Sequence, residues 1–85
     1  MDNHKIAKSF VLDFFGNIGR IPGDTEAQHL DYDYVQDQML DSFGLITLIV
    51  EAESKLKISF SSEDLENPEF KKIGGLIRII ESKLG

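Results

Sequence analysis

The sequence has no cysteine and no long run of apolar residues. Without cysteine, disulfide bonds and thiolate metal sites are excluded, and two histidines far apart, His4 and His29, do not make a transition-metal site. The first residues lead into a segment of mixed polarity, which predicts neither a secretory signal nor a membrane span. We therefore expect a soluble, cytoplasmic protein without a metal centre.

The length of 85 residues predicts one domain, spanning 1–85, with a modest hydrophobic core. Such a domain is too small for an enzyme with a deep cleft and a second structural layer. We expect it to act as a monomer.

Lysine and arginine are absent between Ile21 and Ser54, although this stretch holds eight acidic residues and the net charge is -6. A negative field repels phosphate backbones and anionic lipid, so nucleic acid is not an expected partner. The same field would attract basic enzyme surfaces and speed association with them. Alternatively, the acidic residues only keep a small protein soluble.

Apolar residues recur at intervals of three and four in three segments, which predicts three substantial amphipathic helices. They cover roughly residues 5–15, with Gly16 as a stop, 42–56, and 73–84. Residues 16–40 show no sustained period and predict a long first loop whose apolar side chains, tyrosines included, pack against the helices.

Two shorter signals lie between the second and third of these helices. Ile58 and Phe60 alternate with a serine, which predicts an extended connector with both side chains turned inward. Ser61 followed by Asp64 predicts a capping box that opens a short helix, ended or redirected by Asn67-Pro68. The predicted fold class is all-α, with four helices, a long first loop and a short third helix.

The dipeptide Asp41-Ser42 stands directly before the apolar stripe of the central helix. An aspartate can cap a helix, and the next residue then sits in the first turn, where unpaired N–H groups and the helix dipole favour negative charge. A phosphate ester on Ser42 would be well placed there. Asp-Ser pairs are common at helix starts because both residues cap well, so the pair alone does not identify a modified serine.

The order of elements from about Tyr34 to Ile80, with Asp-Ser-Phe-Gly at 41–44, resembles the acyl carrier protein family. The resemblance implies a small four-helix acyl-carrier-type bundle that catalyses nothing itself. In that family the serine carries 4′-phosphopantetheine, whose thiol holds an acyl or aminoacyl cargo as a thioester and delivers it between enzymes. Carried over to this chain, Ser42 is the attachment site, and Asp41 serves recognition or metal assistance during attachment.

The resemblance also implies partners. A phosphopantetheinyl transferase attaches the arm from coenzyme A with a divalent metal, while an acyl- or aminoacyl-adenylating ligase and acyltransferase-type enzymes load and unload it. Phe43, Ile46 and Val50 match the helix face that meets such enzymes, and the competing interpretation is that they pack under the long loop. Gly44 is similar to the glycine of Asp-Ser-Met-Gly in D-alanyl carrier proteins, whereas Thr47 stands where fatty-acid carriers often have glutamate.

Two hypotheses of other classes remain open beside the carrier. One is a cofactor-free helical interaction module that binds a partner through Phe43, Ile46 and Val50. The other is a small hydrolase in which His29 acts as the base for Ser42.

A further alternative concerns Gly74 and Gly75, which fall in the first turn of the last helix. They mark either a loosely wound helix start or a close approach by another helix or by the arm.

Overall fold

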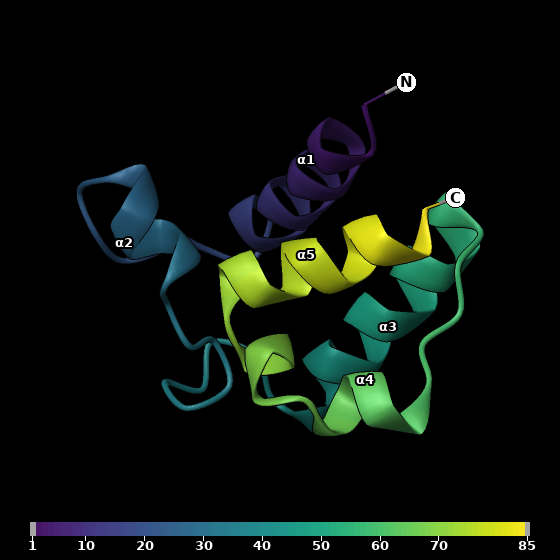
Figure 1. The fold of residues 1–85 in the computed structure, drawn as a ribbon. Helices are drawn as coiled ribbons and strands as arrows, with labels where there is room; N and C mark the ends of the chain where they lie inside the picture. Colours follow the sequence, from purple (N-terminus) through teal and green to yellow (C-terminus); the bar gives the residue numbers. More distant parts are fainter. Residues whose placement is uncertain (1, 85) are drawn as a thin grey trace.

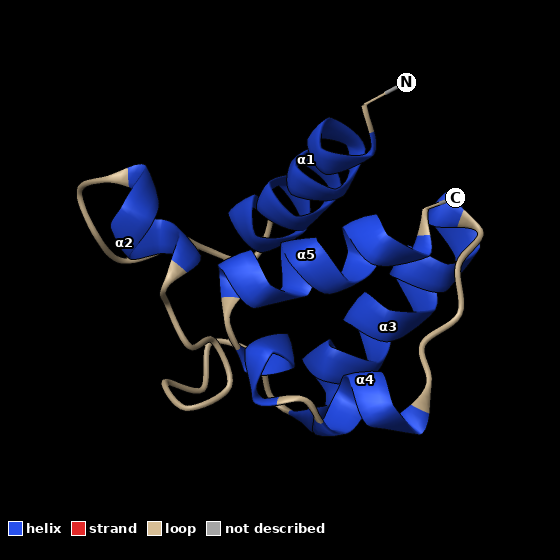
Figure 2. Cartoon of the chain, in the orientation of Figure 1, coloured by secondary structure: helices blue, strands red, loops and turns tan. Residues whose placement is uncertain are grey.

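The computed structural model describes residues 2–84. Within that range the chain forms five α-helices and one 3-10 helix, with no strand (Figure 1 and Figure 2). They are α1 (Asn3–Gly16), α2 (Glu26–Leu30), α3 (Ser42–Leu56), α4 (Ser62–Glu66), η1 (Pro68–Lys71) and α5 (Ile73–Lys83). The all-α class is confirmed, but the predicted count of four helices differs because the long loop contains α2. Among residues 2–84, no helix is long and apolar enough to cross a bilayer.

The helix α5 lies in the middle of the molecule, with α1 along one side and η1 and α4 on the other (Figure 1). Its inward side chains are fully or nearly fully buried and meet buried side chains of α1 and α3. This core consists mainly of Ala7, Val11 and Phe15 from α1, Leu48 and Ala52 from α3, and Ile73, Leu76, Ile77 and Ile80 from α5. The predicted helical periods include all of these side chains except Phe15, which is buried although it lies off the predicted stripe of the first helix.

The end of the long loop is held against the junction of η1 and α5. The N–H of Tyr34 donates to the Lys71 carbonyl at 3.1 Å, and the N–H of Ile73 donates to the Tyr32 carbonyl at 3.1 Å. The Tyr34 ring is buried and its hydroxyl donates to the Phe70 carbonyl. Burial raises the pKa of this hydroxyl well above its ordinary value. The prediction that the loop tyrosines pack is thus confirmed for Tyr34.

The glycine pair lies in the first turn of α5 and is buried there. A Cβ on Gly75 would stand 2.7 Å from the Glu69 carbonyl carbon and closer still to its oxygen. A Cβ on Gly74 would stand 3.0 Å from the Leu30 carbonyl oxygen. Of the two alternatives, close approach is therefore correct, and the approaching elements are η1 and the end of α2.

The helix ends follow the local capping chemistry. The helix α1 begins at Asn3, two residues earlier than predicted, because the Asp2 carboxylate accepts hydrogen bonds from the N–H groups of His4 and Lys5 at 3.0 and 3.3 Å. His4 is an ordered helical residue whose Nδ1 lies 2.7 Å from Oε1 of Glu81 on α5.

The connector and the short helix after α3 agree with the sequence prediction. Ile58 is buried and Phe60 is half-buried in the core. Both hydrogen bonds of the capping box between Ser61 and Asp64 are present, and α4 ends before Asn67-Pro68. A capping box of this kind can be predicted from sequence because its two residues are only three positions apart.

Candidate functional site

The candidate site lies at the start of α3. Asp41 is the N-cap, and its side-chain Oδ1 accepts a hydrogen bond from the N–H of Gly44 at 2.7 Å. Its carbonyl accepts the first helical bond, from the N–H of Leu45 at 2.9 Å. Ser42 is therefore the first residue of α3, and it is exposed. The predicted cap is confirmed, and the Ser42 hydroxyl is open to a second molecule.

An open hollow lies beside this hydroxyl. It is lined by side chains from the end of the loop and from the first turn of α3: Val35, Gln38, Leu40, Asp41, Ser42 and Leu45. Leu40 is buried, and Val35 and Leu45 are half-buried, so the hollow has an apolar floor. Gln38 and Asp41 are exposed and form a polar rim. Ser42 therefore lies at the edge of a surface that has an apolar floor and a polar rim.

The loop wall of the hollow is held by Tyr34. Its carbonyl oxygen accepts hydrogen bonds from the N–H groups of both Met39 and Leu40, at 3.0 and 3.3 Å. Within this turn Gln38 has φ 58°, a left-handed conformation that side chains other than glycine and asparagine rarely adopt. The N–H of Gln38 itself donates to the Val35 carbonyl at 3.1 Å, and the two bonds to Tyr34 fix the residues that follow. The shape of the wall is therefore set by the fold and not by local preference.

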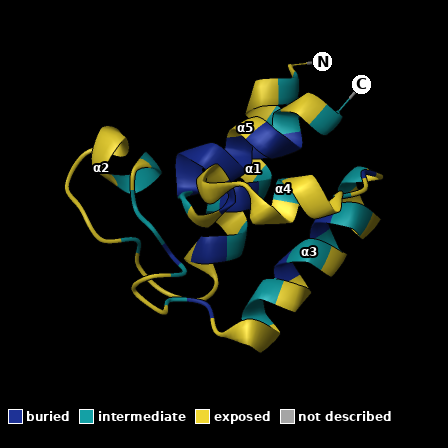
Figure 3. Ribbon diagram, turned by 60° about the horizontal axis from the view of Figure 1, so that its bottom comes forward, coloured by how far each residue is buried: buried dark blue, intermediate teal, exposed yellow. Residues whose placement is uncertain are grey.

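Three apolar side chains project from the outer face of α3. Phe43, Ile46 and Val50 are 82%, 59% and 56% exposed, so they do not pack under the long loop. Figure 3 shows this exposed face along α3, opposite the buried residues that face the core. The buried side of the same helix contains Leu48 and Ala52, as the periodicity predicts. The exposed face carries no charge between Ser42 and Val50.

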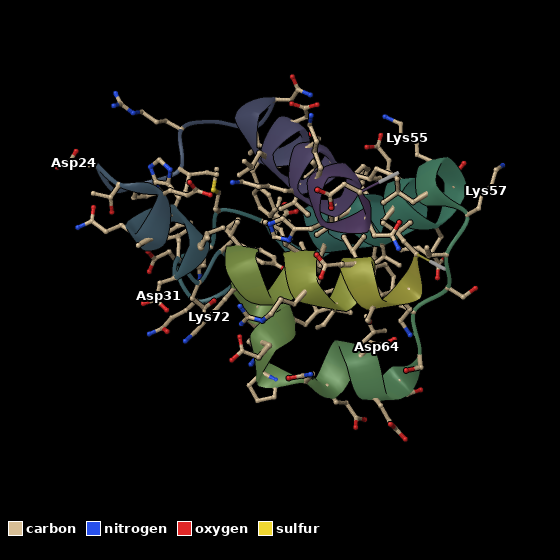
Figure 4. All side chains as sticks on the ribbon, turned by 45° about the horizontal axis from the view of Figure 1, so that its top comes forward. Asp24, Asp31, Lys55, Lys57, Asp64 and Lys72 are labelled. Atoms are coloured by element: carbon tan, nitrogen blue, oxygen red, sulfur yellow. The ribbon has the colours of Figure 1, made fainter. Side chains whose placement is uncertain are left out.

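Two acidic residues of the stretch between Ile21 and Ser54 are paired with lysines of other elements. Glu26 pairs with Lys8 of α1, and the Lys8 ammonium lowers the pKa of the Glu26 carboxyl by a hydrogen bond and by its charge. Asp31 lies 3.6 Å from the Lys72 ammonium, and Figure 4 shows these two side chains side by side. Both acids are therefore engaged with cations from other elements, and neither lines the hollow at Ser42.

The structure does not bring His29 to Ser42. His29 lies on α2, where its Nε2 is 2.8 Å from the Gly23 carbonyl oxygen. None of the residues that line the hollow is a histidine. The hydrolase hypothesis consequently lacks the base that it requires. In the part of the chain that the structure describes, no group of three or more His, Cys, Asp or Glu side chains could hold a metal ion.

A scan against protein-family models, a search of curated proteins and a search of solved structures each found no match for this chain. The interpretation of the site therefore rests on its own residues. Sequence reasoning located Asp41, Ser42 and the exposed face of α3, but it did not foresee the hollow. Val35 and Gln38 carry no local signal for a site, because only the folding of the loop brings them to α3.

Proposed function

We propose that this protein is an acyl carrier that holds an acyl or aminoacyl cargo on a 4′-phosphopantetheine arm attached to Ser42. The observation that carries the proposal is an exposed serine hydroxyl at the first position of a 15-residue helix, directly after a capping aspartate. In this proposal the protein itself catalyses nothing, and no histidine lines the hollow beside the hydroxyl. It would present a thioester to a series of enzymes.

The surroundings of Ser42 fit such an arm. The phosphate of the arm would lie near the first-turn N–H groups of α3, which have no helical partners and face the positive end of the helix dipole. Asp41 uses Oδ1 in the cap and retains a second carboxylate oxygen for a transferase or its divalent metal. When bound, the arm supplies a thiol for the cargo, which this cysteine-free chain does not have.

The arrangement of helices also supports the proposal. The segments that the sequence predicts as helices are α1, α3, α4 and α5, whereas α2 and η1 were not predicted. The exposed side chains Phe43, Ile46 and Val50 lie on the same helix as Ser42 and offer an apolar contact face to the transferase, to a loading ligase and to acyltransferase-type enzymes. A partner that binds this face would have the attached cargo next to it.

The test is the intact mass of the purified protein before and after incubation with coenzyme A, Mg²⁺ and a promiscuous phosphopantetheinyl transferase. The parent is expected to gain one phosphopantetheine, and Ser42→Ala none. Ser59→Ala is the matched control, because Ser59 is also exposed but lies in the connector after α3. It should gain the same mass as the parent. A folded parent that gains no mass, beside a known carrier that does, would refute the proposal.

A second candidate is a cofactor-free interaction module, and the exposure of Phe43, Ile46 and Val50 specifically favours it. In that case Ser42→Ala would leave partner binding and cellular function intact, whereas Phe43→Ala would impair them. The carrier proposal makes the opposite prediction for Ser42→Ala. One complementation experiment with both variants therefore separates the two functions.

A further inference from the structure

We propose that the hollow beside Ser42 is the resting site of the pantetheine arm, which lies over Val35, Leu40 and Leu45 and not between the helices. This inference rests on the proposed carrier function and adds to it a specific binding surface. The part of the arm that would bind to this surface is its uncharged chain beyond the phosphate.

The first argument is the position of the attachment point. Ser42 is itself one of the residues that line the hollow, so a chain that leaves its hydroxyl starts inside this surface. Tethering raises the effective concentration of the arm at a neighbouring surface, so even weak contacts there become populated. No comparable advantage exists for a hollow elsewhere on the molecule.

The second argument is that the chemical groups of pantetheine match the residues that line the hollow. Beyond its phosphate, pantetheine is an uncharged chain with two amide groups and a carbon that bears two methyl groups. The apolar floor of Val35, Leu40 and Leu45 suits the methyl groups, and the Gln38 side chain can both donate to and accept from an amide. Asp41 is the one charged residue of the lining, and it belongs to the end where the phosphate is attached.

The third argument concerns the alternative location in the core. Leu48 and Ala52 of α3 and Leu76 and Ile80 of α5 have no accessible surface at all. A void large enough for one water molecule would give its lining side chains some accessible surface, so no such void adjoins these four residues. An arm or an apolar cargo could enter there only by separating packed side chains. The hollow requires no such separation.

The fourth argument is that the hollow is formed in advance. The Tyr34 carbonyl fixes the backbone at Met39 and Leu40, and the Tyr34 side chain fixes the same segment to η1. A ligand that binds to such a wall does not have to order it first. The left-handed backbone at Gln38 is part of this fixed wall.

The experiment is NMR on the modified protein, uniformly labelled with ¹³C and ¹⁵N and carrying an unlabelled arm. Filtered nuclear Overhauser spectra then report contacts between arm methyl protons and protein methyl groups. We expect contacts to Val35 and Leu45, and chemical-shift changes at Gln38 between the unmodified and modified proteins. Contacts to α5 side chains such as Leu76, or an arm without protein contacts, would overturn the inference.

Two variants and one control sharpen this test. Gln38→Ala removes a hydrogen-bonding group, and Val35→Ala removes two methyl groups from the floor. Each is expected to reduce the equilibrium constant between the docked and the free arm about fivefold, which is the effect of one ordinary hydrogen bond or one or two buried methyl groups. Ile18→Ala, at an exposed apolar side chain after α1 that does not line the hollow, should leave the arm contacts unchanged. Equal contacts in all three variants would overturn the inference.

The outcomes distinguish this inference from the proposed function. If the parent gains no phosphopantetheine in the mass measurement, both fail. If the arm is attached to Ser42 but does not contact the hollow, the carrier function stands and the resting site is wrong.

Discussion

The close contact between α5 and η1 predicts that Gly75→Ala destabilises the protein, although alanine favours helices. Alanine in a helix interior is better than glycine by about 0.5–1 kcal/mol. Against this gain stands a new Cβ at 2.7 Å from both the carbonyl carbon and the Cβ of Glu69. Because backbone atoms cannot rotate away, η1 must move from α5, and overpacking of this kind costs about 1–3 kcal/mol. The difference between these two ranges is a net loss of about 0–2.5 kcal/mol, and we expect a value near the middle, about 1 kcal/mol.

Urea titrations followed by far-UV circular dichroism measure this loss, and thermal melts should show a Tm lowered by roughly 4–8 °C per kcal/mol. Two glycines provide the controls. Gly16→Ala places its Cβ where nothing lies within 4 Å, so this variant should be unchanged or slightly more stable than the parent. Gly74→Ala meets Leu30 at 3.0 Å and should fall between them. A Gly75→Ala protein as stable as Gly16→Ala would refute the reasoning.

Two further predictions concern hydrogen bonds with a pH signature. Tyr34→Phe should cost about 1–3 kcal/mol near neutral pH, because the Phe70 carbonyl loses its buried donor. Burial raises the folded-state pKa of Tyr34, so its contribution is complete below about pH 10 and is lost as the pH rises. Urea midpoints of the parent should therefore fall more steeply in alkali than those of the variant. Asp64→Asn should cost about 0.5–2 kcal/mol by weakening the capping box with Ser61. The hydrogen bond from Lys83 lowers the pKa of Asp64, so this cost should shrink as the pH falls below about 4, and an unchanged cost in acid would contradict the assignment.

The helices and their caps could be predicted because their determinants are local. The inward residues of α3 repeat every three or four positions, and the Asp41 and Ser61 caps reach N–H groups three residues away. Both relations are visible in any window of a few residues. Spacing alone did not decide whether Phe43, Ile46 and Val50 are exposed or lie under the long loop, and the structure shows that they are exposed.

The helix α2 and the hollow could not be predicted because their determinants are distant in sequence. The five residues of α2 offer Leu30 as their one large apolar side chain, so no period is visible, and the helix is held by contacts with α1 and α5. Gln38 adopts a left-handed backbone next to the two N–H groups that Tyr34 holds. Tyr34 is in turn positioned by η1, more than thirty residues further along the chain.

The distribution of charge changes the expected way in which a partner would recognise α3. Of the eight acidic residues between Ile21 and Ser54, Glu26 and Asp31 are paired with cations on α1 and at the start of α5. The residues that follow the serine are uncharged up to Glu51, and Lys55 and Lys57 stand at the far end of the helix, as Figure 4 shows. Charge can then contribute long-range steering, whereas the close contact depends on burial of Phe43 and Ile46. Since burial of apolar surface is not screened by salt, a partner that docks on this face should be retained at high ionic strength.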